Sequence, residues 1–380
     1  MKVLIVQGSD QTNGGGVESF VRTLTQNHNV ADIDFTILGP TDIYNKDNVE
    51  ETMDNIRYLP IKMALGSNKR FLKILNLFIF NLKIFFSKKI YYYNYDVIHI
   101  NGIAGSFFPI RFRNKCIFTV HGNSLDSFLR QRKVYNKSEL PFHFINSIFG
   151  FIFEFLAVKF SKISVSVSPS VAKKFNELTK RRVYVIPNGI EQSHKIIKDK
   201  DGIEKKYNIK PGSFICLWVG RNPERKGLKI AIESITGIMG VYLLVVGIKN
   251  SDLIKGYNNV VLCGNVEEDE LFRLYASSDL LIFPSSYEAM SYTIIEALSM
   301  GLPFISYRKD FMIDIVGSEY PLLCDRDVDF KAKIEDMLTW KSDKIINLKN
   351  ICLDIGKRFN ADKIAISYRK MYEEIINEKQ

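Results

Sequence analysis

Two glutamates stand eight positions apart, Glu288 and Glu296, where a Pro-Ser-Ser loop runs into an apolar helical segment. If this helix starts near residues 291–293, Glu296 falls in its first turn and its carboxylate tilts back toward the loop. The N–H groups at Ser291 and Tyr292 would suit a diphosphate, so Glu296 is expected to accept hydrogen bonds from neutral hydroxyls such as a ribose diol. Glu288, on the loop, would reach a sugar. The competing interpretation is a solvated helix end whose acids complement the helix dipole.

The segment VGRNPERKG, residues 219–227, leaves the first predicted strand of the second half of the chain. Arg221 and Lys226 could hold a diphosphate, the arginine through a fork of donors and the lysine as a point charge. Because these charges are covalently fixed, they could neutralise a departing nucleoside diphosphate without a metal ion. Arg225 is expected to lie in solvent. The simpler alternative for the whole segment is a solvated basic turn.

Two short segments in the first half also follow predicted strands. Gly15 and Gly16 end a run of three glycines that lets the backbone approach a phosphate or sugar closely at the start of a helix. An ordinary turn is the alternative, and the pattern is not G-x-G-x-x-G, so a dinucleotide fingerprint fails. His121, in FTVHG, comes directly after a strand and is expected to hydrogen-bond a sugar hydroxyl. HING, residues 99–102, repeats this arrangement more weakly.

Short β-branched runs alternate with helical patterns along the chain, which indicates parallel sheets covered on both faces. A polar, lysine-rich stretch separates two such series. The pattern therefore predicts two doubly wound, Rossmann-like α/β domains, residues 1–190 and 191–361, with ligands bound beyond the carboxyl ends of the strands in a cleft between them. The expected strands are residues 3–6, 34–38, 97–100, 116–120, 162–167, 183–186, 214–220, 242–247, 260–264, 280–285 and 302–306.

The charge of the chain is concentrated in one part. The formal net charge is +10, and residues 61–190 carry 21 basic and 5 acidic side chains. Such a segment implies an anionic partner, which could be a membrane surface, a nucleic acid or a charged glycan. Nucleic acid is disfavoured because no helix-turn-helix, zinc-finger or RNP-type motif is visible.

The cysteines and the first residues bear on the compartment. The five cysteines are scattered and never spaced as C-x-x-C, which favours buried free thiols in a reducing compartment over a zinc site. The opening MKVLIVQGSD has one lysine and a short apolar run, so it is interpreted as a first strand rather than a signal peptide.

One unusually apolar segment, residues 71–86, places Lys73 and Lys83 on a helical stripe that Phe80 interrupts. Two interpretations stay open: a core helix with a thin wet edge, or an interfacial helix whose lysines meet lipid headgroups. The second would make residues 69–89 the contact with an anionic membrane surface.

A second apolar segment, residues 141–160, has apolar residues at the helical period and leads directly into a strand. This pattern is typical of a helix that covers a sheet. We therefore expect it in the core.

Taken together and in this order, these motifs resemble the retaining glycosyltransferases of family 4, which have the GT-B fold, over nearly the whole chain. The chain departs from the family pattern at Gly14 and at residues 289–291, Ala-Met-Ser, where many members carry Gly-Phe-Gly. The matching motifs are Gly-Gly-Val-Glu (15–18), Val-His-Gly (120–122), Val-Ser-Pro-Ser (167–170), Pro-Asn-Gly-Ile (187–190), Gly-Arg…Lys-Gly (220–227) and the E-x7-E element from Glu288 to Glu296.

The resemblance implies that the family dispenses with a catalytic metal or other cofactor and retains the anomeric configuration through front-face attack. The Asp-Arg-Asp run at 325–327 is accordingly expected to be a surface turn. Residues 362–380 would form a helix that packs back on the N-terminal domain. The implied roles are the ribose for Glu296, the transferred sugar for Glu288 and His121, the diphosphate for Arg221 and Lys226, and backbone contacts to the diphosphate at Gly15, Gly16, Ser291 and Tyr292.

The resulting interpretation is a cytoplasmic enzyme, peripheral on the inner face of the cell membrane, that uses a nucleotide-diphosphate sugar, by resemblance a UDP-sugar. Its acceptor would be a glycan or lipid-linked intermediate of surface polysaccharide, lipopolysaccharide or glycoprotein glycans. Two alternatives are a catalytically silent GT-B scaffold or glycan-binding module, and a GT-B-like sugar-nucleotide epimerase. The sequence leaves the donor sugar, the acceptor, the linkage and the oligomeric state open.

Overall fold

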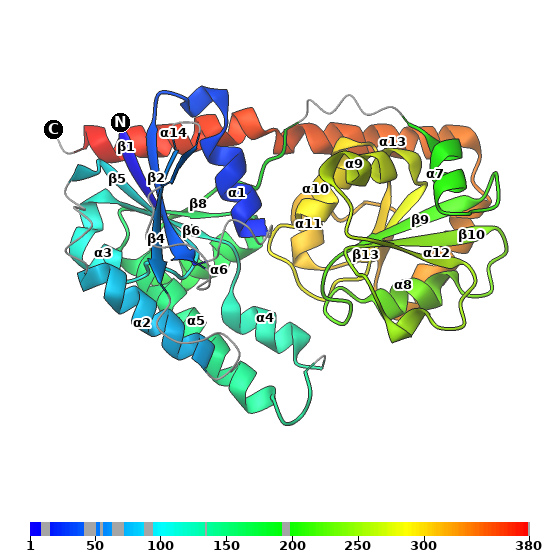
Figure 1. Ribbon diagram of the computed structural model, residues 1–380, viewed down its shortest axis with the longest axis horizontal. Coiled ribbons are helices and arrows are strands. Elements are labelled where there is room, and N and C mark those ends of the chain that lie inside the picture. Colours follow the sequence, from blue (N-terminus) through cyan, green and yellow to red (C-terminus); the bar gives the residue numbers. More distant parts are fainter. Residues whose placement is uncertain are drawn as a thin grey trace. The chain divides into compact units, whose positions relative to one another are not determined.

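The computed structural model of this 380-residue chain describes residues 1–8, 16–41, 51–53, 56–62, 72–86, 94–133, 135–191 and 198–378. The chain divides into two compact units (Figure 1). The N-terminal unit comprises Met1–Gly189 together with Ala361–Gln380, and the C-terminal unit comprises Ile190–Asn360.

The N-terminal unit is built on a sheet with strand order β3-β4-β2-β1-β5-β6-β7-β8. Its strands pair in parallel except β3, which is antiparallel to β4. The central strands are short runs of Val, Ile and Phe buried on both faces, as a sheet covered by helices on each side requires. The strands are β1 (Lys2–Gln7), β2 (Asp34–Thr41), β3 (Glu51–Met53), β4 (Ile56–Lys62), β5 (Val97–Asn101), β6 (Cys116–Val120), β7 (Ile163–Ser166) and β8 (Val183–Val185).

Helices connect these strands as parallel pairing demands. They are α1 (Gly16–Thr25), η2 (His28–Val30), α2 (Leu72–Phe86), α3 (Phe108–Phe112), η4 (Arg113–Lys115), α4 (Ser124–Gln131), α5 (Leu140–Phe160) and α6 (Pro169–Thr179), and the last helix of the chain, α14 (Ala361–Asn377), completes this unit.

The C-terminal unit has a parallel sheet of order β11-β10-β9-β12-β13-β14. Its strands are β9 (Phe214–Val219), β10 (Val241–Val246), β11 (Val260–Gly264), β12 (Leu280–Phe283), β13 (Phe304–Tyr307) and β14 (Leu323–Cys324). Its helices are α7 (Lys200–Lys206), α8 (Leu228–Ile235), η5 (Asp252–Ile254), α9 (Glu268–Ser277), α10 (Tyr292–Ser299), α11 (Asp310–Val316), α12 (Asp327–Leu338), α13 (Ser342–Gly356) and η6 (Lys357–Phe359).

The predicted pair of parallel α/β domains is confirmed, and each expected strand is present. Three strands were missed. β4 contains Pro60, which has no backbone N–H for the ladder and argues against a strand, although β4 pairs with β2 along its whole length. β3 and β14 are only three and two residues long, too short for a periodic signal.

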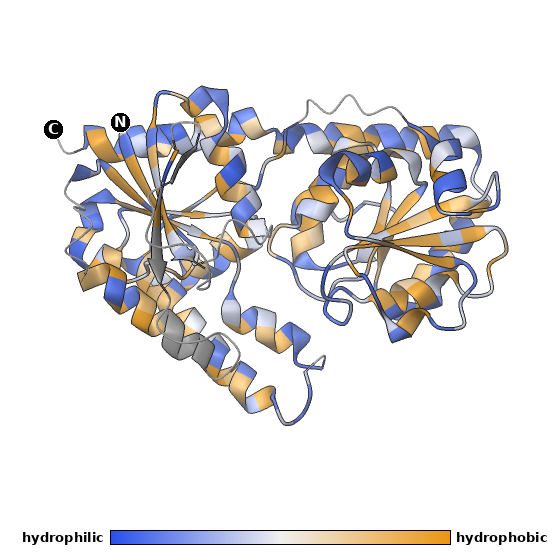
Figure 2. Cartoon of the chain, in the orientation of Figure 1, coloured by the Kyte–Doolittle hydropathy of each residue, from blue (hydrophilic) through white to orange (hydrophobic). Residues whose placement is uncertain are grey.

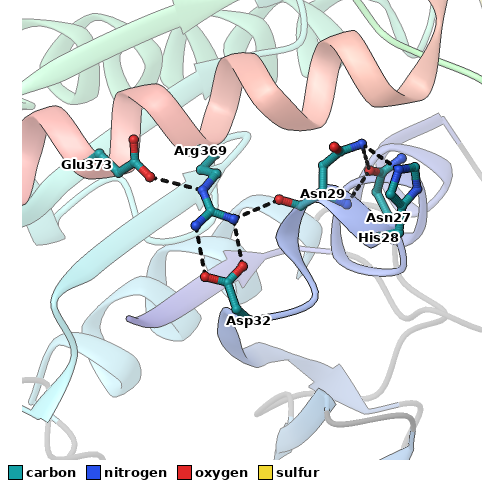
Figure 3. A network of polar contacts seen from close by, with 6 residues as sticks. All are labelled: Asn27, His28, Asn29, Asp32, Arg369 and Glu373. Carbon is teal, nitrogen blue, oxygen red and sulfur yellow. Dashed lines mark hydrogen bonds and ion pairs between the residues drawn. The ribbon is translucent and has the colours of Figure 1, made fainter.

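Helix α14 is fastened to the N-terminal unit by polar contacts (Figure 3). The Arg369 guanidinium makes a two-point contact with Asp32, Nη1–Oδ1 at 2.6 Å and Nη2–Oδ2 at 2.9 Å. Arg369 also donates to the carbonyl oxygen of Asn29 at 2.9 Å and to Glu373 at 2.9 Å. The hydrogen bonds from Arg369 hold the pKa of Asp32 below its ordinary value. The guanidinium fork therefore fixes the orientation of α14 on this unit.

The structure corrects the expectation for residues 141–160. Helix α5 buries Gly150, Phe153 and Ala157 on one side, but large apolar side chains on its other side are exposed. Figure 2 shows that most of the helix is hydrophobic. It is the one helix in the described part of the chain that is long and apolar enough to cross a membrane, with 28% of its most apolar window buried. A helix that is apolar all round leaves such a face wherever its own chain provides no cover. The exposed large apolar residues of α5 are Phe144, Ile145, Phe149, Ile152 and Phe160.

The part of helix α2 whose side chains the structure describes, residues 78–86, matches neither open interpretation fully. Phe80, expected on the wet stripe, is buried with Asn81 and Ile84, whereas Phe78 and Phe86 are exposed. The reason is a specific contact, because the buried Asn81 side-chain oxygen accepts the backbone N–H of Gly105 at 2.8 Å and turns this side of the helix inward. The flanking basic residues of the expected membrane contact, at 69–70 and 88–89, lie outside the described residues.

Candidate functional site

The loops after β9 and β12 meet in the C-terminal unit. Gly227 adopts a left-handed conformation, with φ of 70°, and a Cβ atom at this position would lie 2.5 Å from the carbonyl oxygen of Pro284. Only glycine allows this approach. It brings Lys226, on the first loop, against Glu288, on the second.

Glu288 lies at the centre of a compact charged cluster. Lys226 Nζ is 2.6 Å and Arg225 Nη1 is 3.1 Å from the same Glu288 oxygen, which also accepts the Ser285 hydroxyl at 3.1 Å. The side chains of Glu288 and Lys226 are only 14% and 12% exposed. Burial would raise the pKa of Glu288, but the charges of Lys226 and Arg225 together lower it below its ordinary value. Glu288 is therefore a carboxylate at neutral pH.

This cluster changes the expectation for Arg225. The sequence placed it in solvent, but it is half-buried and ion-paired with Glu288. Arg221, four residues earlier on the same loop, is exposed. Arg225 and Lys226 of this loop are therefore paired with Glu288, and Arg221 lies at its exposed start.

The predicted helix beside the E-x7-E element is α10, which begins at Tyr292 after Ser291. The helix starts within the expected range, and Glu296 is its fifth residue, about one residue beyond the first turn in which it was expected. Its carboxylate accepts the Tyr275 hydroxyl of α9 at 2.8 Å. This contact, rather than helix geometry alone, orients Glu296. The start of α10 offers N–H groups that have no partner inside the helix.

One further polar group in this loop was not singled out from the sequence. The Ser286 hydroxyl is buried and has no hydrogen-bond partner among the described residues. An unsatisfied buried hydroxyl is costly, which makes it a candidate ligand donor next to Glu288. Ser286 directly follows Ser285, and the sequence has no pattern that distinguishes the roles of the two serines.

In the N-terminal unit, His121 follows β6 directly and is half-buried. Its Nε2 contacts the side-chain oxygen of Asn101, the last residue of β5, and its ring packs edge-on against Phe20 at 5.1 Å. Burial lowers the pKa of His121 to about 4. The ring is therefore neutral at pH 7, with the proton on Nε2 and an acceptor at Nδ1.

Gly16 is the first residue of α1, the helix that carries Phe20, so it lies at the same strand-end edge of the sheet as His121. Gly15 lies outside the described residues. Asn101 was noted in the sequence only as part of HING, and its position at a strand end was the available signal.

The histidine of HING, His99, connects these strands to α14. His99 is fully buried, with Nδ1 2.7 Å from the Tyr372 hydroxyl and Nε2 2.8 Å from the Thr119 hydroxyl. Tyr368, also on α14, stacks on the His99 ring at 5.3 Å. Helix α14 is thereby tied to the two strands that end in Asn101 and precede His121.

These contacts predict an acid-sensitive fold. Burial lowers the pKa of His99 from 6.5 to about 3, so its contribution is complete above pH 6.5 and is lost as the pH falls toward 3. The free energy of unfolding should decrease by about 1.4 kcal/mol per pH unit, up to about 5 kcal/mol. The free energy of unfolding can be measured by urea titration at several pH values between 7 and 4. Its slope against pH should be smaller by this amount in His99→Gln. The exposed His28→Gln is the control, and equal slopes in wild type and His99→Gln would contradict the assignment.

The run at 325–327 is exposed, and its last residue, Asp327, begins α12. Asp325 and Arg326 donate their backbone N–H groups to Asp329 at 3.2 and 2.9 Å, so the run caps the start of α12. Across the described ranges, no three His, Cys, Asp or Glu side chains gather into a group that could hold a metal ion.

Comparison with known families gives a match in each unit. Residues 14–194 match the family described as Glycosyltransferase Family 4. Residues 213–339 match the family described as Glycosyl transferases group 1. The E-x7-E element, the basic loop after β9 and His121 all fall inside these ranges.

Two similar proteins come from Escherichia coli. The O-antigen biosynthesis glycosyltransferase WclY is 21% identical over 299 residues, which span 75% of this chain and 80% of that protein. The UDP-Gal:alpha-D-GlcNAc-diphosphoundecaprenol alpha-1,3-galactosyltransferase is 27% identical over 217 residues, 52% of this chain and 56% of that protein.

Two solved structures have the same fold. Sucrose-phosphate synthase from Thermosynechococcus elongatus has a TM-score of 0.79 at 19% identity and covers 99% of both chains. Anabaena HepE, solved with UDP-glucose, has a TM-score of 0.71 at 15% identity and covers 98% of this chain and 100% of its own. The predicted GT-B fold is confirmed.

Proposed function

This chain belongs to the family 4 glycosyltransferases, and from that membership we propose a retaining transfer of sugar from a UDP-sugar to a lipid-linked or glycan acceptor in lipopolysaccharide or O-antigen assembly. The names of the two E. coli relatives support the pathway, the UDP donor and a diphosphate-linked lipid acceptor. The observation that carries the proposal is the buried Lys226–Glu288 pair near the start of α10.

The donor diphosphate would bind at the basic loop after β9. Lys226 has three ammonium donors, so it can keep its contact with Glu288 and also take a phosphate oxygen. Arg221 would add a guanidinium fork, and the backbone at Ser291 and Tyr292 would add helix N-terminal N–H groups. Backbone at Gly15 and Gly16 would complete the cradle. Because these positive charges are built into the chain, we propose that the reaction needs no metal or other cofactor.

The remaining residues would hold neutral hydroxyls. Glu296, already oriented by Tyr275, would accept hydrogen bonds from the ribose diol. Glu288 would accept a hydroxyl of the transferred sugar, and its low pKa keeps it an acceptor at neutral pH. His121 would offer Nδ1 to another sugar hydroxyl, which its neutral state permits.

The proposed chemistry is attack from the face that the diphosphate leaves. The bond between the anomeric carbon and the diphosphate oxygen breaks, and a bond to the acceptor oxygen forms on the same side, so the anomeric configuration is retained. The acceptor proton passes to the departing phosphate oxygen. The protein residues stabilise the charge that develops on the diphosphate, which is the largest usual contribution of a site of this kind.

We further propose that the enzyme works in the cytoplasm, peripheral on the inner face of the cell membrane. The exposed apolar side of α5 supports this, because its five large side chains fall within an arc of about 160° at 100° per residue. The end of α4 and its connection to α5 add exposed cations that suit anionic lipid headgroups. These cations are Arg130, Arg132, Lys133 and Lys137. A lipid-linked acceptor would be reached from that surface.

The test is release of free nucleoside diphosphate from a panel of UDP- and GDP-sugars, with and without acceptor lipid. We expect slow hydrolysis of one UDP-sugar alone and faster turnover with acceptor. Glu296→Ala should weaken donor binding at least tenfold, whereas Glu335→Ala, an exposed acid on α12, should not change it. Silence across the panel would indicate a scaffold, and sugar conversion without diphosphate release would indicate an epimerase. Either result would overturn the proposal.

A further inference from the structure

A basic cavity of about 540 Å³ opens in the N-terminal unit, at the start of β7 and β8. It lies at the opposite end of the sheet from His121, because η4, which directly precedes β6, borders it, whereas His121 follows the end of β6. Five residues of β6 place these ends about 16 Å apart. The cavity is therefore separate from the residues discussed above. Its basic lining consists of Arg113, Lys162, Lys180, Arg181 and Arg182.

Contacts within the unit hold several of these cations in place. Arg181 Nη2 donates to the carbonyl oxygens of Ser161 at 2.9 Å and Lys162 at 3.3 Å, and Lys162 forms an ion pair with Glu378 of the C-terminal segment. The Arg182 guanidinium stacks over the Tyr184 ring at 4.5 Å. Fixed guanidinium groups lose little conformational freedom when they bind an anion, so the lining is preorganised.

Lys180 sits in a strained position. It ends α6 in a left-handed conformation with φ of 54°, where glycine or asparagine is usual. This backbone conformation is less favourable for lysine than for glycine, yet the Lys180 side chain lines the cavity. Strain kept at a site of this kind points to a use for the side chain.

The charges of the lining are unbalanced. Five cations face two carboxylates, Glu374 and Glu378. Arg113, Lys180 and Arg182 have no carboxylate partner among the residues that the structure describes. An anion with two or more negative charges would neutralise them, and guanidinium forks match phosphate oxygens in pairs.

We propose that this cavity binds a phosphate-bearing anion. The source is either free phosphate or pyrophosphate, or the phosphate of a lipid headgroup. The second source is close at hand, since α5 ends in the exposed Lys159 and Phe160, directly before Ser161 and Lys162 of the cavity region. The proposal does not depend on the sugar-transfer reaction.

The test uses the full-length protein and two probes. In calorimetry with pyrophosphate, Lys180→Gln/Arg182→Gln should weaken one class of sites at least tenfold, and Lys173→Gln/Lys210→Gln, exposed lysines elsewhere, should not. Arg221→Gln/Lys226→Gln removes pyrophosphate binding at the proposed donor loop and should leave the cavity class intact. Flotation with phosphatidylglycerol vesicles, against phosphatidylcholine, tests the headgroup source.

If Lys180→Gln/Arg182→Gln weakens only the binding of pyrophosphate in calorimetry, the ligand is free phosphate or pyrophosphate. If it weakens only the binding of vesicles in flotation, the ligand is the lipid headgroup. Unchanged binding of both probes in Lys180→Gln/Arg182→Gln would overturn the proposal. Lys180→Gly guards against a folding defect, because glycine relieves the left-handed backbone. We expect this variant to melt at a higher temperature than wild type and still to bind the probe at least threefold more weakly; unweakened binding would also overturn the proposal.

Discussion

Glu288→Gln is expected to lower the turnover number of sugar transfer by about 10²–10³-fold, the usual effect of removing one preorganised electrostatic group from a site. Glutamine keeps the shape of the side chain but removes the charge that holds Lys226 and Arg225 in place. The two cations would lose their fixed positions beside the donor diphosphate. The measurement is nucleoside diphosphate release at saturating donor and acceptor.

A second effect of the same change is on stability. Glu288→Gln leaves the nearly buried Lys226 without a counter-charge, which costs about 3 kcal/mol for a buried pair. Glu288→Gln/Lys226→Gln should recover part of this loss while staying inactive. The control for the Lys226 change is Lys229→Gln, which removes the same charge from an exposed lysine of α8 whose side chain is 73% exposed. This variant should be active. Turnover of Glu288→Gln within threefold of wild type would remove Glu288 from the site.

Replacing Phe149 and Ile152 of α5 with glutamine is expected to weaken binding to anionic vesicles at least tenfold. Each side chain would lose about 1.5–3 kcal/mol of transfer free energy if it is buried in the lipid interface. Both are more than 40% exposed, so the fold should tolerate the change. Vesicle flotation measures the effect, and donor hydrolysis without acceptor should be unchanged.

Two comparisons decide which surface binds the membrane. Ile346→Gln removes an exposed isoleucine of α13 in the other unit and should leave vesicle binding intact. Glutamine at Lys69, Arg70, Lys73 and Lys83 tests the segment expected from the sequence. If that variant loses vesicle binding and the α5 variant keeps it, the α5 assignment is wrong.

The exposed side of α5 could not be predicted from the sequence. The apolar pattern correctly predicted a helix at 141–160, because helical periodicity is local. The pattern did not reveal that one side would stay uncovered, since coverage depends on which elements pack there. The inner face is defined by close contacts such as Gly150, where a Cβ would lie 2.7 Å from the Ser124 hydroxyl oxygen. No sequence pattern near α5 predicts that Gly150 packs against Ser124.

The ion pairs around Glu288 also could not be predicted from the sequence. The sequence identified Glu288, Lys226 and Arg221 as site candidates through their motifs. It assigned Arg225 to solvent, and it placed the diphosphate rather than Glu288 next to Lys226. Arg225 and Glu288 are 63 positions apart, and their contact exists only because Gly227 lets two loops approach.

The sequence by itself determined the two series of strands, the positions of the functional motifs at strand ends and the family. These features are written in short-range patterns of apolar residues, glycines and charges, which fix local backbone structure and can be read without a fold. Only the tertiary structure decided which charges pair, that His99 supports the sheet through α14, and that α5 keeps an apolar face. Those outcomes depend on contacts between segments far apart in the chain, where burial and charge pairing set the energies.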